Sequence, residues 1–124
     1  MKANKTLIIA EAGVNHNGDI KKAKDLVQVA ADSGADIVKF QTIIAENLVT
    51  QNSPLANYQK KQKGSTGNQF QLLKELELSQ QDFKELSDLS NKLKIEFLST
   101  AFDISSLEFL VNLGAKRIKI PSGE

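Results

Sequence analysis

The residues Gly34-Ala-Asp-Ile-Val-Lys-Phe40 join the end of a helical pattern to a short apolar strand. The same frame returns as Gly114-Ala-Lys-Arg-Ile-Lys-Ile120, so a lysine follows the glycine by five residues in both places, at Lys39 and Lys119. A cation in a buried strand is costly unless it meets an anion. The repetition therefore predicts one anionic ligand held by two neighbouring strands.

Strand and helix patterns alternate outward from these two frames. Apolar strand-type runs lie at Thr6–Ala10, Ile37–Gln41, Ile95–Ser99 and Ile118–Pro121. Helical spacing of apolar residues predicts helices at Ile20–Ser33, Gln80–Lys92 and Ile104–Leu113. The expected caps and stops are Asp19, Gly34, the Ser79/Asp82 capping box, Asp103 and Gly114. This β-α-β-α-β-α-β order predicts a parallel sheet with right-handed crossovers.

The connection from Thr42 to Leu78 is much longer than an ordinary loop between a strand and a helix. Its length indicates that the segment has a function and is not merely a linker. We predict a short helix at Gln69–Leu76, and we interpret the polar, lysine-rich stretch Ala56–Gly67 as a solvated loop.

Four strands and three helices make half of an eight-stranded barrel. A complete (β/α)8 barrel needs about 250 residues, and this chain has 124. We therefore expect an α/β fold of the parallel TIM-barrel type, with only the first four strands and three helices present here. A small open doubly wound sheet is the alternative, but the fourth strand has no helix after it to cover it.

Composition excludes several classes of function. The chain is 40% hydrophobic and 25% charged, with a net charge of +1, which gives no electrostatic case for binding nucleic acid or an anionic membrane. It has no cysteine, so disulfides and thiolate metal sites are excluded. No segment reads as a secretory signal or a membrane span. A cytoplasmic protein is the expectation.

Polar residues follow each predicted strand, at the end where parallel α/β folds bind ligands. The four clusters are Glu11–Gly18, Lys39–Gln41, Ser99–Asp103 and Lys119–Glu124. Lysine pairs can clamp a phosphate or carboxylate, and a serine hydroxyl adds a directed hydrogen bond. A glutamine amide can bind a sugar hydroxyl, and a carboxylate can move a proton.

Each of these residues also has a purely structural interpretation. Glu11 and Lys39 could form an ion pair between adjacent strands. His16 lies in a turn-like stretch and is better explained as a loop or supporting residue than as a metal ligand. Phe102 could belong to the core or pack on a substrate. The role of Glu124 is undetermined.

Together the clusters resemble the sialic acid synthase family, which includes N-acetylneuraminate synthase and bacterial relatives that make legionaminic and pseudaminic acids. Further matching segments lie in the long connection, so the resemblance covers essentially the whole chain. The matching segments are Ile8–Gly18, Gly34–Gln41, Glu46–Val49, Asn57–Gln59, Leu76–Leu78, Ile95–Asp103 and Lys119–Glu124.

The resemblance implies a (β/α)8 barrel followed by a small antifreeze-like domain, of which residues 1–124 would be the N-terminal half of the barrel. It implies condensation of phosphoenolpyruvate with an open-chain N-acetylated hexosamine, N-acetylmannosamine or a diacetylated relative, with loss of phosphate. A divalent metal, typically Mn²⁺, would activate the sugar aldehyde. The enzyme is expected to act as a homo-oligomer.

The resemblance also implies roles for individual residues. Lys39, Lys119 and Ser122 would hold phosphoenolpyruvate. Glu11, Gln41 and Phe102 would contact the amino sugar, with Glu11 handling the proton.

Two departures from the family pattern qualify these expectations. Ala101 stands where the family usually has proline, so the turn holding Phe102 is expected to be looser. The metal-binding histidines of the family lie in later strands, so no metal ligand is expected in this chain and the fragment alone should be inactive. The alternatives are a non-catalytic phosphate- or sugar-binding module, and a 3-deoxy-ulosonic acid phosphate synthase, against which the Glu11–Gly18 segment speaks.

Overall fold

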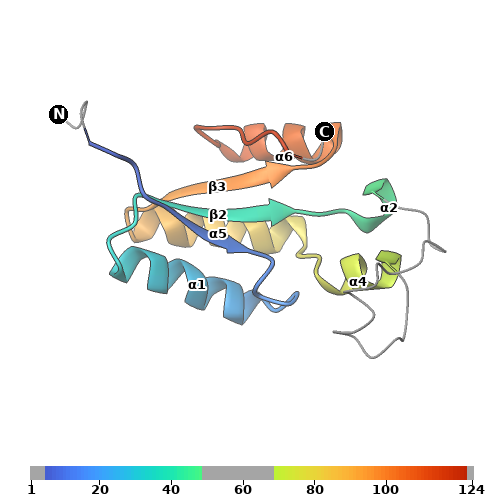
Figure 1. Ribbon diagram of the computed structural model, residues 1–124, viewed down its shortest axis with the longest axis horizontal. Helices are drawn as coiled ribbons and strands as arrows, with labels where there is room; N and C mark the ends of the chain where they lie inside the picture. Colours follow the sequence, from blue (N-terminus) through green and yellow to red (C-terminus); the bar gives the residue numbers. More distant parts are fainter. Residues whose placement is uncertain (1–4, 49–68, 123–124) are drawn as a thin grey trace.

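A parallel sheet forms the centre of the protein. The structure, a computed structural model, describes residues 5–48 and 69–122. Within these residues, hydrogen-bonded ladders join β1 (Ile9–Gly13), β2 (Ile37–Thr42) and β3 (Glu96–Ala101) in the order β1-β2-β3. Both pairings are parallel, so the three strands end at the same edge of the sheet (Figure 1). The predicted parallel α/β fold is confirmed.

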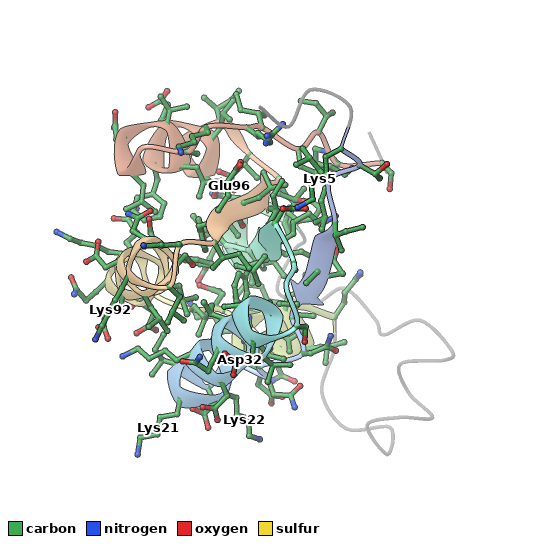
Figure 2. The ribbon with its side chains drawn as sticks, turned by 90° about the vertical axis from the view of Figure 1, so that its left-hand side faces the viewer. Lys5, Lys21, Lys22, Asp32, Lys92 and Glu96 are labelled. Atoms are coloured by element: carbon green, nitrogen blue, oxygen red, sulfur yellow. The ribbon has the colours of Figure 1, made fainter. Side chains whose placement is uncertain are left out.

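Helices cover one face of this sheet. They are α1 (Ile20–Asp32), α5 (Gln80–Lys92) and α6 (Ile104–Leu113), and Figure 1 shows α6 beside β3. Figure 2 shows the charged side chains of Lys21 and Lys22 on α1 pointing away from the sheet. The apolar side chains between helices and sheet form the core, which includes Val27, Val38, Phe40, Phe83, Leu86 and Phe97.

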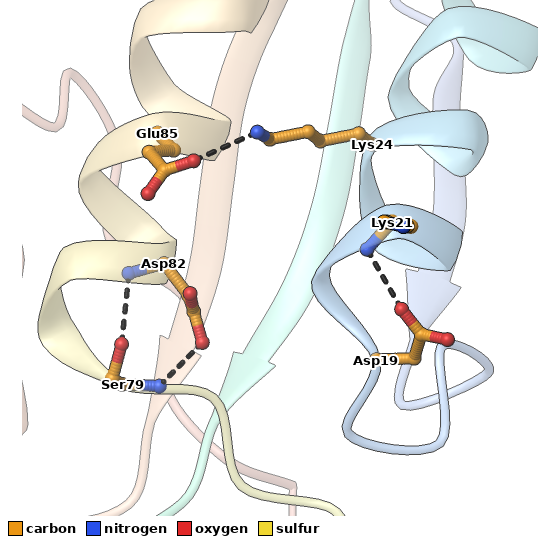
Figure 3. Close-up of polar contacts among 6 residues, drawn as sticks. All are labelled: Asp19, Lys21, Lys24, Ser79, Asp82 and Glu85. Carbon is orange, nitrogen blue, oxygen red and sulfur yellow. Dashed lines mark hydrogen bonds and ion pairs between the residues drawn. The ribbon is translucent and has the colours of Figure 1, made fainter.

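Local signals at the helix ends are confirmed. Asp19, Ser79 and Asp103 are the N-caps, and each side chain accepts a hydrogen bond from a backbone N–H of the first turn. The Ser79 hydroxyl and the Asp82 carboxylate each accept from the other residue's backbone N–H, as a capping box requires (Figure 3). Gly114 ends α6 with a φ of 99°. These contacts act within one turn, which is why the sequence shows them.

The long connection begins and ends with short helices at the carboxyl edge of the sheet (Figure 1). They are α2 (Ala45–Leu48), which was not predicted, and α4 (Gln69–Glu75), which ends one residue earlier than expected. The Lys74 ammonium lies 2.9 Å from Glu46 and 3.4 Å from Glu77. The carboxylate of Glu77 also accepts from the backbone N–H of Ala45. The predicted solvated loop Ala56–Gly67 lies outside the described residues.

The first strand lies further along the chain than predicted. Thr6–Ala10 was expected, but the ladder begins at Ile9 because its partner β2 begins at Ile37, the residue opposite. Before that point, the Ile8 amide donates to the Asp36 carboxylate at 2.9 Å. The strand then continues to Gly13 because residues beyond Ala10 still find partners on β2.

The prediction of a fourth strand at Ile118–Pro121 is wrong, because this segment does not pair with β3 as an extended ladder. The described part of this segment makes one isolated bridge, between Lys119 and Thr100. Pro121 has no N–H to donate, so the ladder cannot continue through it. The direction of the bridge is parallel, so the segment still lies beside β3.

None of the helices found in residues 5–48 and 69–122 is both long enough and apolar enough to cross a membrane.

Candidate active site

On the face of the sheet that points away from the helices, the strand register aligns the side chains in two rows that run across the strands. In the first row, Glu11 stands opposite Lys39, and Lys39 opposite Leu98. In the second row, Gln41 stands opposite Thr100, and the bridge puts Lys119 beside Thr100. Because alternate residues of a strand share a face, both rows face the same way, near the carboxyl edge.

Glu11 and Lys39 form an ion pair with 2.7 Å between Oε1 and Nζ. This is the structural alternative that the sequence left open. The exposures of the two side chains differ: 18% for Lys39 and 51% for Glu11. The carboxylate therefore neutralises a largely buried cation while half of its own surface stays open to another group.

A β-bulge follows Glu11. The register shifts between Glu11 and Gly13, so Ala12 has no partner on β2. Gly13 has a φ of 55°, and a Cβ built on it would lie 3.1 Å from Oε2 of Glu11. A glycine here therefore allows the left-handed backbone and leaves room for the carboxylate.

Lys39 and Lys119 do not lie on neighbouring strands, which corrects the sequence interpretation. β3 lies between them, so their backbones are two strand spacings, about 10 Å, apart across the sheet, and they are further offset by two residues along it, because Lys39 stands opposite Leu98 and Lys119 beside Thr100. The Lys119 ammonium donates to the carbonyl of Ile120 at 2.6 Å. Both lysines still share one face of the sheet, and long side chains can converge on a ligand that spans Thr100.

Phe102 lies with Lys119 rather than with the predicted sugar residues. The two line a largely apolar hollow of about 280 Å³ between the start of α6 and the segment from Ile118 to Pro121. Glu11 and Gln41 are not among the residues lining it. Ser122 is exposed at the end of the same segment.

The sequence interpretation missed Thr100. This residue is 5% exposed and stands between Gln41 and Lys119. Behind it, the hydroxyls of Ser99 and Thr42 are 2.7 Å apart in the core and join β2 to β3. Period-two alternation along β3 was the available signal, since it puts Thr100 on the face opposite to that of Ser99.

Asp103 connects the turn between β3 and α6 to α2, at the start of the long connection. Its Oδ1 accepts from the Ser106 N–H at 2.7 Å, and its Oδ2 accepts from the Asn47 amide of α2 at 3.2 Å. Partial burial acts to raise the pKa of Asp103, but these hydrogen bonds outweigh it and hold the pKa below its ordinary value. Asp103 is therefore a cap, as expected, and also a link to α2.

A larger hollow, of about 380 Å³, lies at the opposite end of the strands. Its lining includes Asp36, Lys94, Glu96 and Lys116. Parallel α/β sheets bind substrates at the carboxyl ends of their strands. The rows that contain Glu11 and Lys119 are therefore the better candidate.

Comparison with known proteins supports the family resemblance seen in the sequence and the parallel α/β fold. Residues 26–124 match the sequence profile of the NeuB family. The N,N'-diacetyllegionaminic acid synthase of Legionella pneumophila is 56% identical over 117 residues, which are 94% of this chain and 33% of that protein. The enzyme of the same name from Campylobacter jejuni is 52% identical, over 97% of this chain and 36% of that protein.

More distant relatives extend the comparison. The mouse N-acetylneuraminate-9-phosphate synthase is 34% identical over 94% of this chain and 32% of its own length. The crystal structure of the N-acetylneuraminic acid synthetase of Leptospira borgpetersenii, in complex with citrate, superposes with a TM-score of 0.74 at 32% identity. It covers 93% of this chain and 36% of the Leptospira chain. The present chain thus spans about a third of the length of these relatives.

Proposed function

The chain belongs to the NeuB family, and on this premise we propose that the protein containing it condenses phosphoenolpyruvate with an N-acetylated hexosamine. One water is consumed: the enol carbon bonds to the sugar aldehyde carbon, water adds to the resulting oxocarbenium, and inorganic phosphate leaves to give a nonulosonic, sialic-type acid. The observation that carries the proposal is the pair of rows on one sheet face, in which a half-exposed carboxylate and two lysines stand near a common edge.

Phosphoenolpyruvate needs cations for both its phosphate and its carboxylate. Lys39 and Lys119 supply these from either side of β3, with Ser122 as a hydroxyl donor beyond Lys119. The citrate in the related Leptospira structure shows that this relative binds a polyanion. In our proposal, the incoming anion competes with Glu11 for the ammonium of Lys39.

Release from Lys39 leaves Glu11 free to act on the sugar. Its carboxylate accepts hydrogen bonds from sugar hydroxyls and takes up or returns a proton during attack on the aldehyde. Gln41 follows in the next row on the same face and binds a second sugar hydroxyl. We retain Phe102 as a sugar contact, although it lies nearer to Lys119 than to Glu11.

The sugar is proposed to be a diacetylated hexosamine. Identity is 56% and 52% with two legionaminic acid synthases, against 34% with the mouse neuraminate phosphate synthase. A diacetamido hexose plus the three carbons of phosphoenolpyruvate yields the carbon skeleton of the legionaminic product. N-acetylmannosamine is the alternative substrate.

A divalent metal, Mn²⁺ by the family resemblance, would polarise the sugar aldehyde. Among residues 5–48 and 69–122, no group of three or more His, Asp or Glu side chains is disposed to hold a metal. The described residues therefore do not fit a metal site, and no step assigned to them runs through the metal. We propose that the ligands come from the rest of a (β/α)8 barrel, of which this chain is the first half, in a cytoplasmic homo-oligomer.

Phosphate release from the full-length protein tests the proposal. The protein is given phosphoenolpyruvate alone, then together with a diacetamido hexose or with N-acetylmannosamine, in the presence of Mn²⁺. We expect phosphate only when sugar is present, with one nonulosonic acid formed per phosphate. No phosphate with either sugar, or phosphate from phosphoenolpyruvate alone, would contradict the proposal. Binding without turnover would favour the non-catalytic module.

A further inference from the structure

The loop between β1 and α1 is held in the core by one imidazole. His16 is 0% exposed, whereas its neighbours Asn15 and Asn17 are exposed. Its ring packs against Phe40 of β2, with 6.1 Å between ring centroids. Phe40 lies between Lys39 and Gln41, so the imidazole rests against the strand that bears two of the candidate site residues.

The hydrogen bonds of His16 define its protonation state. Its Nδ1 accepts from the backbone N–H of Gly18 at 2.9 Å, so this nitrogen carries no proton. The proton of the neutral ring is then on Nε2, which is buried and has no hydrogen-bond partner among the described residues. A second proton would have to enter at Nδ1 and would break the bond to Gly18.

The surroundings favour the neutral ring. Burial lowers the pKa of His16 below its ordinary value of 6.5, while the charges of Asp19 and Asp82 oppose this shift only in part. These are the acidic groups that act on it from the start of α1 and from α5. The contact from β2 is the uncharged ring of Phe40.

The loop that the imidazole holds starts at the bulge after Glu11. It consists of successive turns closed by backbone hydrogen bonds of 3.0–3.1 Å. The N–H groups of Asn15, Asn17 and Asp19 donate to the carbonyl oxygens of Ala12, Val14 and His16, respectively. Asn17 and Gly18 both have positive φ, at 54° and 78°. Such a chain of tight turns keeps its shape only if the surroundings over-determine it.

The end of the long connection between β2 and α5 packs against the same loop. A Cβ built on Gly18 would lie 2.1 Å from the backbone carbonyl oxygen of Glu75, at the end of α4. Gly18 is therefore held between the His16 ring nitrogen, which accepts from its N–H, and the segment that returns from the long connection. The ladder places Glu11 opposite Lys39, and a loop clamped on both sides fixes the segment that directly follows Glu11.

We propose that neutral His16 is a positioning residue for the reaction: through its bond to Gly18 and its contact with Phe40, it holds the β1–α1 loop so that Glu11 is correctly placed toward the sugar. The idea rests on the proposed function only for its effect on turnover. The anchoring itself is a property of this chain and can be measured separately.

Three variants of the full-length protein separate the effects of the ring, the acceptor and stability. His16→Phe keeps the ring volume and the contact with Phe40 but removes the acceptor. His16→Asn loses the ring but puts an amide oxygen near the place of Nδ1. Val27→Ala, which truncates a buried side chain of α1, is the control for general destabilisation.

Turnover and its pH dependence are the first measurements. We expect His16→Phe to lose about 10-fold or more in kcat, because a loop shift near 1 Å has effects of this size, with little change in KM for phosphoenolpyruvate. His16→Asn should recover most of the loss, and its kcat should not fall in the acidic range where wild-type His16 becomes protonated. Val27→Ala should keep the wild-type kcat and pH profile.

Hydrogen–deuterium exchange over residues 13–19 is the second measurement. The Gly18 amide should exchange faster in His16→Phe than in wild type, and near the wild-type rate in His16→Asn and Val27→Ala. Equal exchange and equal kcat in wild type and His16→Phe would overturn the proposal, as would equal losses in His16→Phe and His16→Asn. If wild type releases no phosphate, the proposed function fails and exchange alone decides whether His16 anchors the loop.

Discussion

Glu11 on β1 stands opposite Lys39 on β2, and their side chains meet at 2.7 Å on the face of the sheet away from the helices. The lysine is the more buried partner, so it depends on an anion being present. In the proposed enzyme that anion changes from Glu11 to phosphoenolpyruvate during the cycle. This exchange gives the first two predictions.

Removing either lysine should chiefly weaken phosphoenolpyruvate binding. Lys39→Met and Lys119→Met in the full-length protein each remove one cation from the clamp, at an expected cost of about 2–5 kcal/mol in binding free energy. Titration calorimetry with phosphoenolpyruvate measures it. Lys24→Met is the matched control, because Lys24 pairs at 2.7 Å with Glu85 between α1 and α5 (Figure 3). Unchanged affinity in both site variants would show that the lysines do not form the clamp.

Glu11→Gln should reduce turnover without weakening phosphoenolpyruvate binding. The amide keeps the size of the side chain but removes its charge and basicity, so kcat should fall about 100-fold or more. Because Lys39 no longer has to leave a carboxylate, phosphoenolpyruvate affinity should be equal to that of wild type or higher. Phosphate-release kinetics and calorimetry test both parts, with Glu85→Gln as control. Normal turnover would reduce Glu11 to a structural partner of Lys39.

Gly18→Ala should destabilise the protein more than Gly34→Ala. Both glycines have positive φ, at 78° and 82°, so both alanines meet a backbone cost of about 1–2 kcal/mol. At Gly34 the new Cβ meets nothing within 4 Å, whereas at Gly18 it collides with the Glu75 carbonyl. We expect an additional loss of about 1–3 kcal/mol at Gly18, measured by urea unfolding. Equal losses would show that the contact with α4 is not tight.

Stability should fall on mild acidification because of His16. Its pKa is lowered in the folded protein, so between the ordinary value of 6.5 and the lower folded value the unfolded chain binds more protons. The free energy of unfolding therefore decreases as pH falls through this window and is fully retained above it. Urea titrations from about pH 7.5 to about pH 5 measure the slope.

His16→Asn is the control for this pH effect. Without a titrating ring, the variant should show a flatter dependence in the same range. Asp103 also has a lowered pKa, but its ordinary value of 3.8 is that of a carboxyl group, so it changes the free energy of unfolding only at lower pH. An identical slope in wild type and His16→Asn would show that His16 does not titrate differently in the two states.

Structure that depends on nearby residues could be predicted well. The bounds of α5 and α6 agree with the sequence analysis, and Asp19, Ser79 and Asp103 cap their helices as expected. Helical periodicity and caps are interactions over three or four residues, so one segment contains all the information. The short helix α2 was missed because four residues carry too little periodicity to recognise.

Features that depend on pairing could not be predicted in detail. β1 was placed too early, and the segment around Lys119 was expected to form a strand but makes a single bridge. Strand bounds depend on where the partner begins and ends, and a partner distant in sequence leaves no local mark. For the same reason, the separation of Lys39 from Lys119 by β3 was not visible in the sequence.

By itself, the sequence determined the parallel α/β class, the N-caps of α1, α5 and α6, the family and the set of polar residues at the strand ends, since these follow from local patterns and motifs. Only the tertiary structure decided that Glu11 faces Lys39, that Thr100 lies between Gln41 and Lys119, and that His16 is the buried anchor of its loop. The physical reason for the first two is register: in a sheet, a shift of one residue moves every side chain to the other face, and only the paired strands define that shift. The burial of His16 depends on packing against Phe40, a residue distant in sequence.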